Sequence, residues 1–568
     1  MSQLGGGSPV LRGFEANRVL LVIDNIRMNN AIYRSGHLQN AITVDENALS
    51  TLEVSYGPGA LAFGSDAIGG LIHFKTKNPL PLGQEQRQWS GRLAMRYGTA
   101  AQEQVFSADL TYQSRNWSSY TTFTASRFSD LEAGNRRPDN YPNFGTHPFY
   151  VERIAGEDII QINSKPDQQI GSGYDQLDLL QKVSWQAHPN LLLQFNGQYS
   201  TSSDVPRYDR LVETRDSQPR FAEWYYGPQE RSLFAASANW QSSRSWGEHV
   251  RIILSRQDIR EDRFKRSFQR PWREENLVGL DLTALTVDIY KQTGRRSALK
   301  YGGEVRKEMV EASAARRSLD DGQVQFDINS RYPSAGSSLN AYSTYLQYQG
   351  HNTDSSFLWE SGLRWTQRKL FAQFSASDPI AWPAPYLAGI NNNNSALNAA
   401  SGMRWRKGQW LFRSHLATGF RAPNIDDFAK FRENNGFLQI PNPELEPERS
   451  ISADFSIRYE PNPNNNIQVT LYRTWLYQAM IREDFLLPDG SDSFESRDEI
   501  LFVQAIVNAE QARVWGLSAS FKQQLFNQWT LQAQLHYTYG RRDFKLDETT
   551  IIEVPLDHIP PIYGQLST

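Results

Sequence analysis

Hydrophobic and polar residues alternate with a period of two along most of this chain. Residues 89–98, WSGRLAMRYG, place large apolar side chains at every second position, and residues 193–200, 357–365 and 529–540 repeat the pattern. Such alternation is typical of β-strands that have one apolar and one polar face. The segments are about 9 to 11 residues long, which is the length that a tilted strand needs to cross a membrane.

A large soluble antiparallel sheet also alternates, so the pattern alone leaves two fold classes open. Two features favour a membrane barrel. The segments are longer than the usual strand of about 5 to 6 residues. Several also carry rings at or near both ends, as with Trp89 and Tyr97 or Trp529 and Tyr539, which is how an aromatic girdle is built.

Connections between the predicted strands come in two sizes, as in membrane barrels, which have short periplasmic turns and long extracellular loops. Residues 244–249 and 461–466 are short turns. The long polar segments are 129–175, 203–230, 262–276, 314–338, 372–396 and 424–447. The alternation predicts that Trp89, Leu93, Leu531 and Leu535 face lipid, and that Arg92, Arg96, Gln532 and Gln534 face the lumen.

The first 78 residues have a different pattern of apolar and polar positions and form a separate predicted domain. The strand-rich domain 79–568 follows it. Residues 18–28, RVLLVIDNIRM, read as an apolar strand ending in a turn. Residues 43–57 read as a short helix, with Asp45 as its cap, that leads into a strand. A glycine-rich stretch then precedes a strand at 71–77, and glycine suits a backbone that turns sharply in a confined space.

Composition narrows the functional classes. The chain has 568 residues, no cysteine and a net charge of -3, with 59 Lys and Arg against 62 Asp and Glu. It therefore lacks the basic excess of a nucleic-acid binder, and disulfides and zinc-thiolate sites are excluded. The sequence contains no HExxH, no phosphate loop and no GxSxG motif, so we expect no catalytic residue, no metal and no cofactor. A content of 12% aromatic residues at a mean hydropathy of -0.59 suits a membrane interface.

Residues 53–77, EVSYGPGALAFGSDAIGGLIHFKTK, resemble the end of the plug domain of TonB-dependent outer-membrane receptors. Further motifs follow in the family's order: RGF and VLLVIDNIRM upstream, then ATGFRAPNIDDF (417–428), NPELEPERS (442–450), VNAEQARVWGL (507–517) and PLDHIPPIYG (555–564). The resemblance implies an all-β membrane fold. It consists of a large antiparallel transmembrane barrel, about 22 strands when complete, with a small α+β plug in its lumen.

The resemblance also implies a function in the outer membrane of a Gram-negative bacterium. Receptors of this family import a scarce, bulky nutrient through an energised rearrangement of the plug, and a ferric siderophore or other iron complex is favoured here. Import of haem or cobalamin, or a non-transporting surface receptor with the same shell, are the alternatives. The implied partner is the TonB–ExbB–ExbD complex, which would act through an N-terminal segment that this sequence does not contain. We expect the sequence to be truncated at both ends.

Candidate binding residues follow from the same resemblance. The outward plug loop offers Tyr33, Arg34, His37 and Asn40, and the 207–228 segment offers Arg207, Arg210, Trp224, Tyr225 and Tyr226. Arginine mixed with rings suits an anionic, aromatic iron chelate, although such a loop could equally pack on itself.

Some haem receptors of the family carry Gly-His-Leu at the position of His37 and use a second histidine between their FRAP and NPxL motifs. This chain has no histidine between Pro423 and Asn442, so an iron chelate ranks above haem. Arg12 and Glu53 are the candidates for ion pairs between the plug and the barrel.

Overall fold

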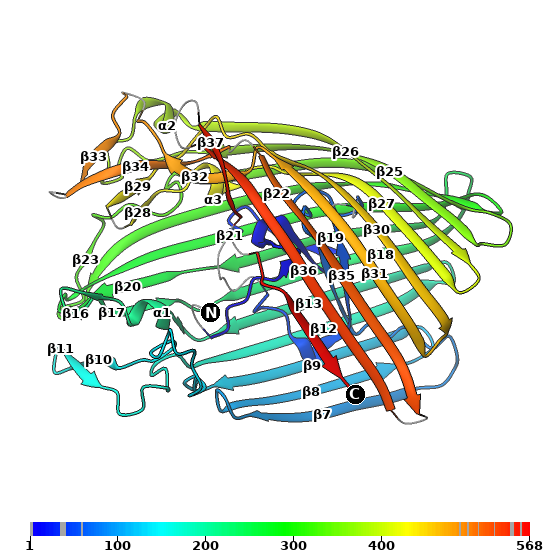
Figure 1. Cartoon of the computed structure of the whole chain (residues 1–568), viewed down its shortest axis with the longest axis horizontal. Coiled ribbons are helices and arrows are strands. Elements are labelled where there is room, and N and C mark those ends of the chain that lie inside the picture. The colour runs from blue at the N-terminus through cyan, green and yellow to red at the C-terminus, as the bar shows by residue number, and fades with distance from the viewer. Residues whose placement is uncertain are drawn as a thin grey trace.

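A closed antiparallel barrel surrounds a small domain in the computed structural model (Figure 1). The structure describes residues 4–34, 41–57, 59, 61–434, 436–487, 490–496, 499–508, 511–526, 529–545, 550–556 and 559–568. The membrane all-β class predicted from the sequence is confirmed. No helix within these residues is long and apolar enough to span a membrane.

The long strands of the barrel wall pair with their sequence neighbours. They are β7 (Gln88–Gly98), β8 (Glu103–Gln113), β9 (Trp117–Phe128), β12 (Tyr174–His188), β13 (Leu191–Ser202), β18 (Glu230–Arg244), β19 (Gly247–Arg260), β21 (Trp272–Gly294), β22 (Ser297–Ser318), β24 (Ser337–His351), β25 (Phe357–Ala372), β26 (Ile390–Lys407), β27 (Trp410–Arg421), β30 (Glu448–Asn462), β31 (Asn465–Tyr477), β35 (Gln511–Phe526) and β36 (Trp529–Lys545), followed by the shorter β38 (Tyr563–Ser567). Short strands extend the wall beyond its rim: β14 (Val205–Pro206), β17 (Phe221–Tyr226), β20 (Arg263–Ser267), β23 (Val324–Gln325) and β37 (Ile551–Pro555).

The predicted lumen and lipid faces are confirmed on β7. Leu93 is 76% exposed on the outside of the barrel. Arg92 donates to the carbonyl of Asn47 at 3.2 Å, and Arg96 pairs with Glu46, so both arginines point inward at the plug. The period-two pattern therefore assigns the faces of this strand correctly.

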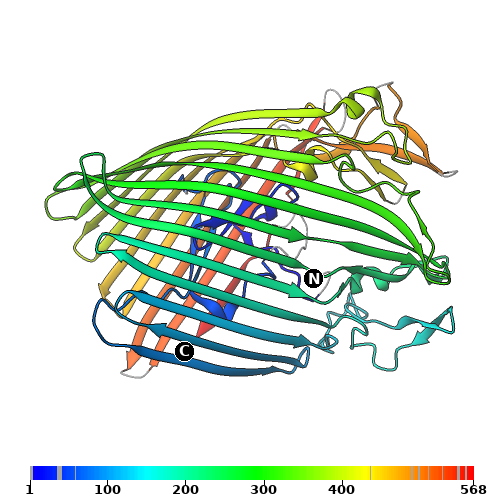
Figure 2. The ribbon, with the colours of Figure 1, turned by 180° about the vertical axis from the view of Figure 1, so that it is seen from behind.

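The plug is a four-stranded sheet in the order β4-β3-β6-β5, inside the barrel (Figure 2). Its elements are β1 (Val10–Leu11), β2 (Phe14–Glu15), η1 (Ala16–Arg18), β3 (Val19–Ile23), β4 (Ile26–Arg27), η2 (Glu46–Ala48), β5 (Leu49–Tyr56) and β6 (Gly70–Thr76). The predicted short helix is a 3-10 turn, and Asp45 caps it by accepting from the Asn47 N–H at 2.9 Å. Gly70 has φ 146°, and a Cβ there would lie 2.3 Å from the Ser55 carbonyl, so only glycine fits.

Short turns gather at one end of the barrel and long loops at the other (Figure 1). The loops carry β10 (Phe149–Ile154), β11 (Glu157–Ile162), α1 (Tyr208–Leu211), β15 (Thr214–Arg215), β16 (Gln218–Pro219), α2 (Ala384–Ala388), α3 (Ile425–Phe428), β28 (Arg432–Asn434), β29 (Phe437–Gln439), β32 (Met480–Asp484), β33 (Ser493–Ser496) and β34 (Glu499–Asn508).

The loop boundaries differ from the sequence prediction in several places. The strands β21, β22 and β26 run into segments that were predicted as loops, because ladder hydrogen bonds continue after the side chains turn polar. Residues 478–508 were not predicted as a loop. Their strand β34 joins β28, β29, β32 and β33 in a sheet separate from the wall.

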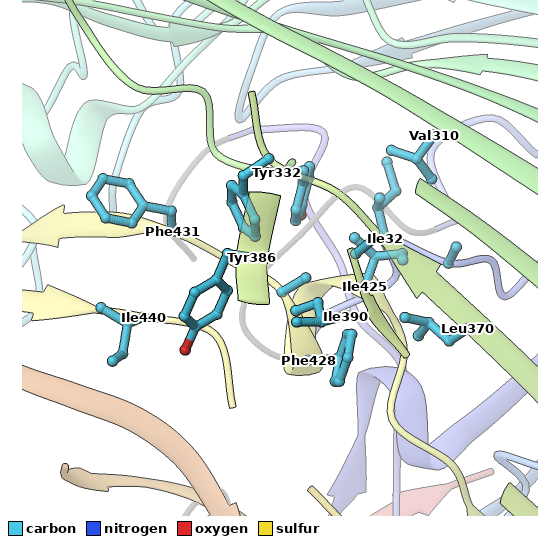
Figure 3. Packing of buried hydrophobic residues seen from close by; sticks show 14 of the residues in the cluster. Ile32, Val310, Tyr332, Leu370, Tyr386, Ile390, Ile425, Phe428, Phe431 and Ile440 are labelled. Atoms are coloured by element: carbon cyan, nitrogen blue, oxygen red, sulfur yellow. The ribbon is translucent and has the colours of Figure 1, made fainter. Parts of the chain in front are cut away.

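The extracellular loops share a hydrophobic core with the top of the plug (Figure 3). Ile32 of the plug packs in one cluster with loop residues such as Tyr332, Tyr386, Ile425 and Phe428. We call these packed loops the loop cap. Since the cap and the plug share close-packed buried side chains, a displacement of one changes the packing of the other.

Candidate ligand-binding site above the plug

Residues 30–34, here called the apical segment, form the outward end of the plug and are held from two sides. From the wall, Glu308 accepts the N–H of Ala31 at 2.6 Å. From the loop cap, the N–H of Ile425 donates to the Ala31 carbonyl at 2.8 Å, and the side chain of Asn424 donates to the Tyr33 carbonyl.

The short helix α3 makes the loop-side contacts, and its sequence explains its geometry. Asn424 is the N-cap and accepts from the Asp427 N–H at 3.0 Å, while the Asp427 carboxylate accepts from the Asn424 N–H at 3.2 Å. This capping box fixes the first turn. Ile425 and Phe428 are fully buried in the loop cap, so α3 is a rigid part of it.

Asp426, between these contacts, is a buried carboxylate shared by three donors from two loops. It accepts from the Tyr332 hydroxyl at 2.7 Å, from Arg331 at 3.1 Å and from Lys430 at 2.9 Å. Burial alone would raise the pKa of Asp426, but Lys430, Arg331 and Arg34 hold it well below its usual range. Asp426 is therefore an anion at neutral pH.

A second shared carboxylate, Glu261, joins the plug to the loop above β19. Arg34 of the apical segment pairs with Glu261, and Arg263 donates to the same carboxylate at 3.1 Å. The pKa of Arg263 falls to about 10 because the side chain is buried and lies near Arg331 and Arg34.

Rings from β17 lie beside these cations. Arg207 donates to the Tyr226 hydroxyl at 2.9 Å and lies 4.8 Å from the centre of the Trp224 ring. Burial would raise the pKa of Tyr226, but Arg263, Arg34 and Arg207 lower it. Three guanidiniums thus converge on one phenol, together with Glu261 and with Asp209, which pairs with Arg207 at 2.7 Å.

Further out, Arg432 and Arg482 add positive charge with no ion pair to any residue that the structure describes. Burial, followed by the guanidiniums of Arg331, Arg263, Arg482 and Arg210, lowers the pKa of Arg432 to about 9. We define the cationic cluster as these converging side chains from the plug and the loops: Arg34, Arg207, Arg210, Arg263, Arg331, Lys430, Arg432 and Arg482. Its inner members share Asp426 and Glu261. Arg207 pairs with Asp209 and Arg210 with Glu213. Arg432 and Arg482 are short of counter-ions.

The structure brings some of the predicted binding residues together and separates others. Arg34, Arg207, Trp224 and Tyr226 meet at the cluster, and Arg210 lies at its edge, paired with Glu213. Tyr225 is on the opposite face of β17, where it stacks on Phe264 and accepts from Arg273.

Of the remaining binding residues predicted on the plug, the structure describes one. Tyr33 is only 7% exposed and packs in the core between plug and wall. His37 and Asn40 lie outside the described residues.

The two predicted ion pairs between plug and wall also differ. Arg12 pairs with Asp454 of the wall and lies between the rings of Tyr56 and Tyr472. Glu53 instead pairs with Lys75 of the neighbouring plug strand at 2.5 Å, so the expected contact with the wall does not form.

Sequence reasoning missed most of the cationic cluster. Asp426, Lys430 and Arg432 follow the FRAP motif closely, which is a local signal. Arg263, Arg331 and Arg482 come from separate loops, and only the closed barrel brings them together.

Comparisons with known proteins agree with this architecture. The TonB dependent receptor-like β-barrel model matches residues 45–568, and the TonB-dependent receptor plug domain model matches residues 2–71. The hemin receptor of Yersinia pestis is 22% identical over 97% of this chain and 73% of its own length. The vitamin B12 transporter BtuB of Vibrio vulnificus is 27% identical over 43% of this chain, and the match spans 32% of that relative.

Solved structures share the fold at low identity. The copper transporter OprC superposes with a TM-score of 0.72 at 13% identity, over 99% of this chain and 76% of its own. The hemophore receptor HasR of Serratia marcescens superposes with a TM-score of 0.68 at 15% identity, over 99% of this chain and 81% of its own. The two family models together span nearly the whole sequence, and the chain therefore belongs to the TonB-dependent receptors of the Gram-negative outer membrane.

Proposed function

We propose that this receptor imports a bulky, anionic iron chelate, bound by the cationic cluster above the plug and released inward by a TonB-driven rearrangement of the plug. The observation that carries the proposal is the convergence of cations from the plug and several loops on one place, with Arg432 and Arg482 short of counter-ions. Like charges held together are unfavourable, and a polyanion would relieve that repulsion.

The rings beside the cluster suit the same ligand. Trp224 and Tyr226 pack edge to face, with centroids 5.3 Å apart, and Arg207 lies over Trp224. Guanidiniums and aromatic faces together bind planar, electron-rich anions through charge and stacking. A ferric tris-catecholate has both a negative charge and aromatic rings, whereas a ferric tris-hydroxamate has no net charge.

Haem is the second candidate, supported by the likeness to the hemin receptor of Yersinia pestis over nearly the whole chain. The propionates of haem would also suit the cationic cluster. An axial histidine would have to come from outside the described residues, where His37 lies, because no described histidine contacts the cluster. Cobalamin carries less negative charge and ranks below both.

The test is titration of the purified receptor in detergent with ferric tris-catecholate, ferric tris-hydroxamate, haem and cobalamin. We expect tight binding of the catecholate that weakens with added salt. The double variant Arg432→Ser/Arg482→Ser should bind it about thirtyfold or more weakly, the usual effect of removing a buried hot spot. Arg115→Ser, which removes an exposed arginine paired with Glu85 beside the short turn before β9, is the matched control.

Three results would change the assignment. Equal binding of both iron chelates would mean that the charge of the chelate does not determine its affinity. Tight haem binding that His37→Ala abolishes would make the protein a haem receptor. Failure to bind any of the four ligands would contradict import of an iron chelate and favour a receptor that does not transport.

A further inference from the structure

We infer that α3 is a latch that reports occupancy of the cationic cluster to the plug. The inference rests on the proposed function and concerns how the bound anion acts. Three consecutive residues, Asn424, Ile425 and Asp426, connect the two sites. The first two bind carbonyls of the apical segment, and the third is a counter-ion of the cluster.

On the plug side, the latch is made of main-chain acceptors, so it needs no particular plug side chain. The Ile425 N–H bonds the Ala31 carbonyl, and the Asn424 amide bonds the Tyr33 carbonyl. Asn424 is 4% exposed and Ile425 is fully buried. Losing these bonds would leave buried polar groups unpaired, so the latch opens only when something compensates.

On the ligand side, Asp426 occupies the cations that an incoming anion needs. Arg331 and Lys430 both donate to it, and a ligand oxygen that binds either one competes with this carboxylate. Displaced from its donors, Asp426 becomes an unpaired buried charge, which is strongly unfavourable. Its relief is to turn toward solvent, which moves the backbone of the same helical turn.

The rigidity of α3 carries that movement to the plug. The capping box ties Asn424 to Asp427 on either side of Asp426, so the turn moves as a unit. When it moves, the Ala31 and Tyr33 carbonyls lose their donors. The apical segment is then held by Glu308 and by the ion pair between Arg34 and Glu261. Ligand binding therefore loosens the outward end of the plug before TonB pulls.

Hydrogen–deuterium exchange of the receptor, with and without ferric tris-catecholate, tests the latch directly. The Ile425 amide is the reporter, because its hydrogen bond is the latch itself. We expect the ligand to raise exchange at Ile425 and in the apical segment by about tenfold, within the usual range of coupling between sites.

Two variants separate the two halves of the latch. Asp426→Asn removes the competing anion and also the buried charge whose relief moves the turn, so it should bind the chelate more tightly while exchange at Ile425 stays slow with or without ligand. Asn424→Ala should give fast exchange in the apical segment and, because coupling between two sites is reciprocal, should bind the chelate up to about tenfold more tightly. Asp158→Asn is the matched control, since Asp158 is also a buried loop carboxylate, paired with Arg266 at 2.7 Å, and should leave exchange at Ile425 as in the wild type.

The outcomes distinguish the latch from the proposed function. A wild-type receptor that binds the chelate with no change at Ile425 overturns the latch and leaves the function standing. A wild type that binds no anionic chelate overturns the function. If Asp426→Asn does not fold, the wild-type measurement and Asn424→Ala decide, and an Asn424→Ala protein with wild-type exchange in the apical segment contradicts the latch.

Discussion

At the scale of single residues, environment decides what a charge can do. Asp426 and Asp454 are both paired carboxylates, but Asp426 accepts from three donors on two loops whereas Asp454 pairs with Arg12 at the wall. The first is suited to exchange its partners for a ligand. The second seats the plug, with the Arg12 guanidinium 4.0 Å from the centre of the Tyr472 ring.

The lipid face of β36 gives a prediction at this scale. Leu535 is 44% exposed on the outside of the barrel, well inside its strand. Leu535→Arg should destabilise the folded barrel by about 2 to 4 kcal/mol, the cost of a lipid-facing arginine at mid-depth. Urea titration in bilayers measures it, with Gln534→Arg on the lumen face as the control. Equal stability of the two variants would mean that the register of β36 is wrong.

At the scale of elements, periodic segments were predictable and the contacts between distant segments were not. The alternation in residues 89–98 and 529–540 located β7 and β36, and the glycine-rich stretch marked the turn into β6. Asn424 and Tyr33 are 391 positions apart, and no local pattern pairs them. The sheet around β34 was not predictable for the same reason, because its partners β29 and β32 come from two different loops.

The loop that carries β10 and β11 contains a buried histidine and should respond to pH. Both ring nitrogens of His147 are buried and have no hydrogen-bond partner within the described residues. Burial lowers the pKa of His147, and Asp130 only partly opposes this. The unfolded loop, with an ordinary histidine pKa of about 6.5, therefore binds the proton more readily than the folded loop.

The sign of the pH effect follows from that difference. The loop should keep constant stability above about pH 6.5 and lose stability as the pH falls below it, until the folded form is protonated too. Limited proteolysis of residues 129–173 at about pH 7.5 and about pH 5.5 measures this. His147→Phe should remove the dependence. A loop that is cleaved equally fast at both pH values in the wild type would refute the prediction.

At the scale of the whole molecule, the closed barrel brings together cationic side chains that are far apart in the sequence. The family resemblance located the plug, the wall and the outward loops, and it suggested Arg34 and Arg207 as binding residues. It could not indicate Arg263, Arg331 or Arg482, because their convergence depends on which loops fold inward over the plug. The loop cap decides this through its shared core with Ile32 of the plug.

Uptake of radioactive iron by cells whose only receptor for these chelates is this protein tests the central claim most directly. We predict that iron from ferric tris-catecholate enters and iron from the neutral tris-hydroxamate does not. Uptake should stop when TonB is deleted and should fall at least about tenfold in Arg432→Ser/Arg482→Ser. Equal uptake of the two chelates, or catecholate uptake that continues without TonB, would contradict the account.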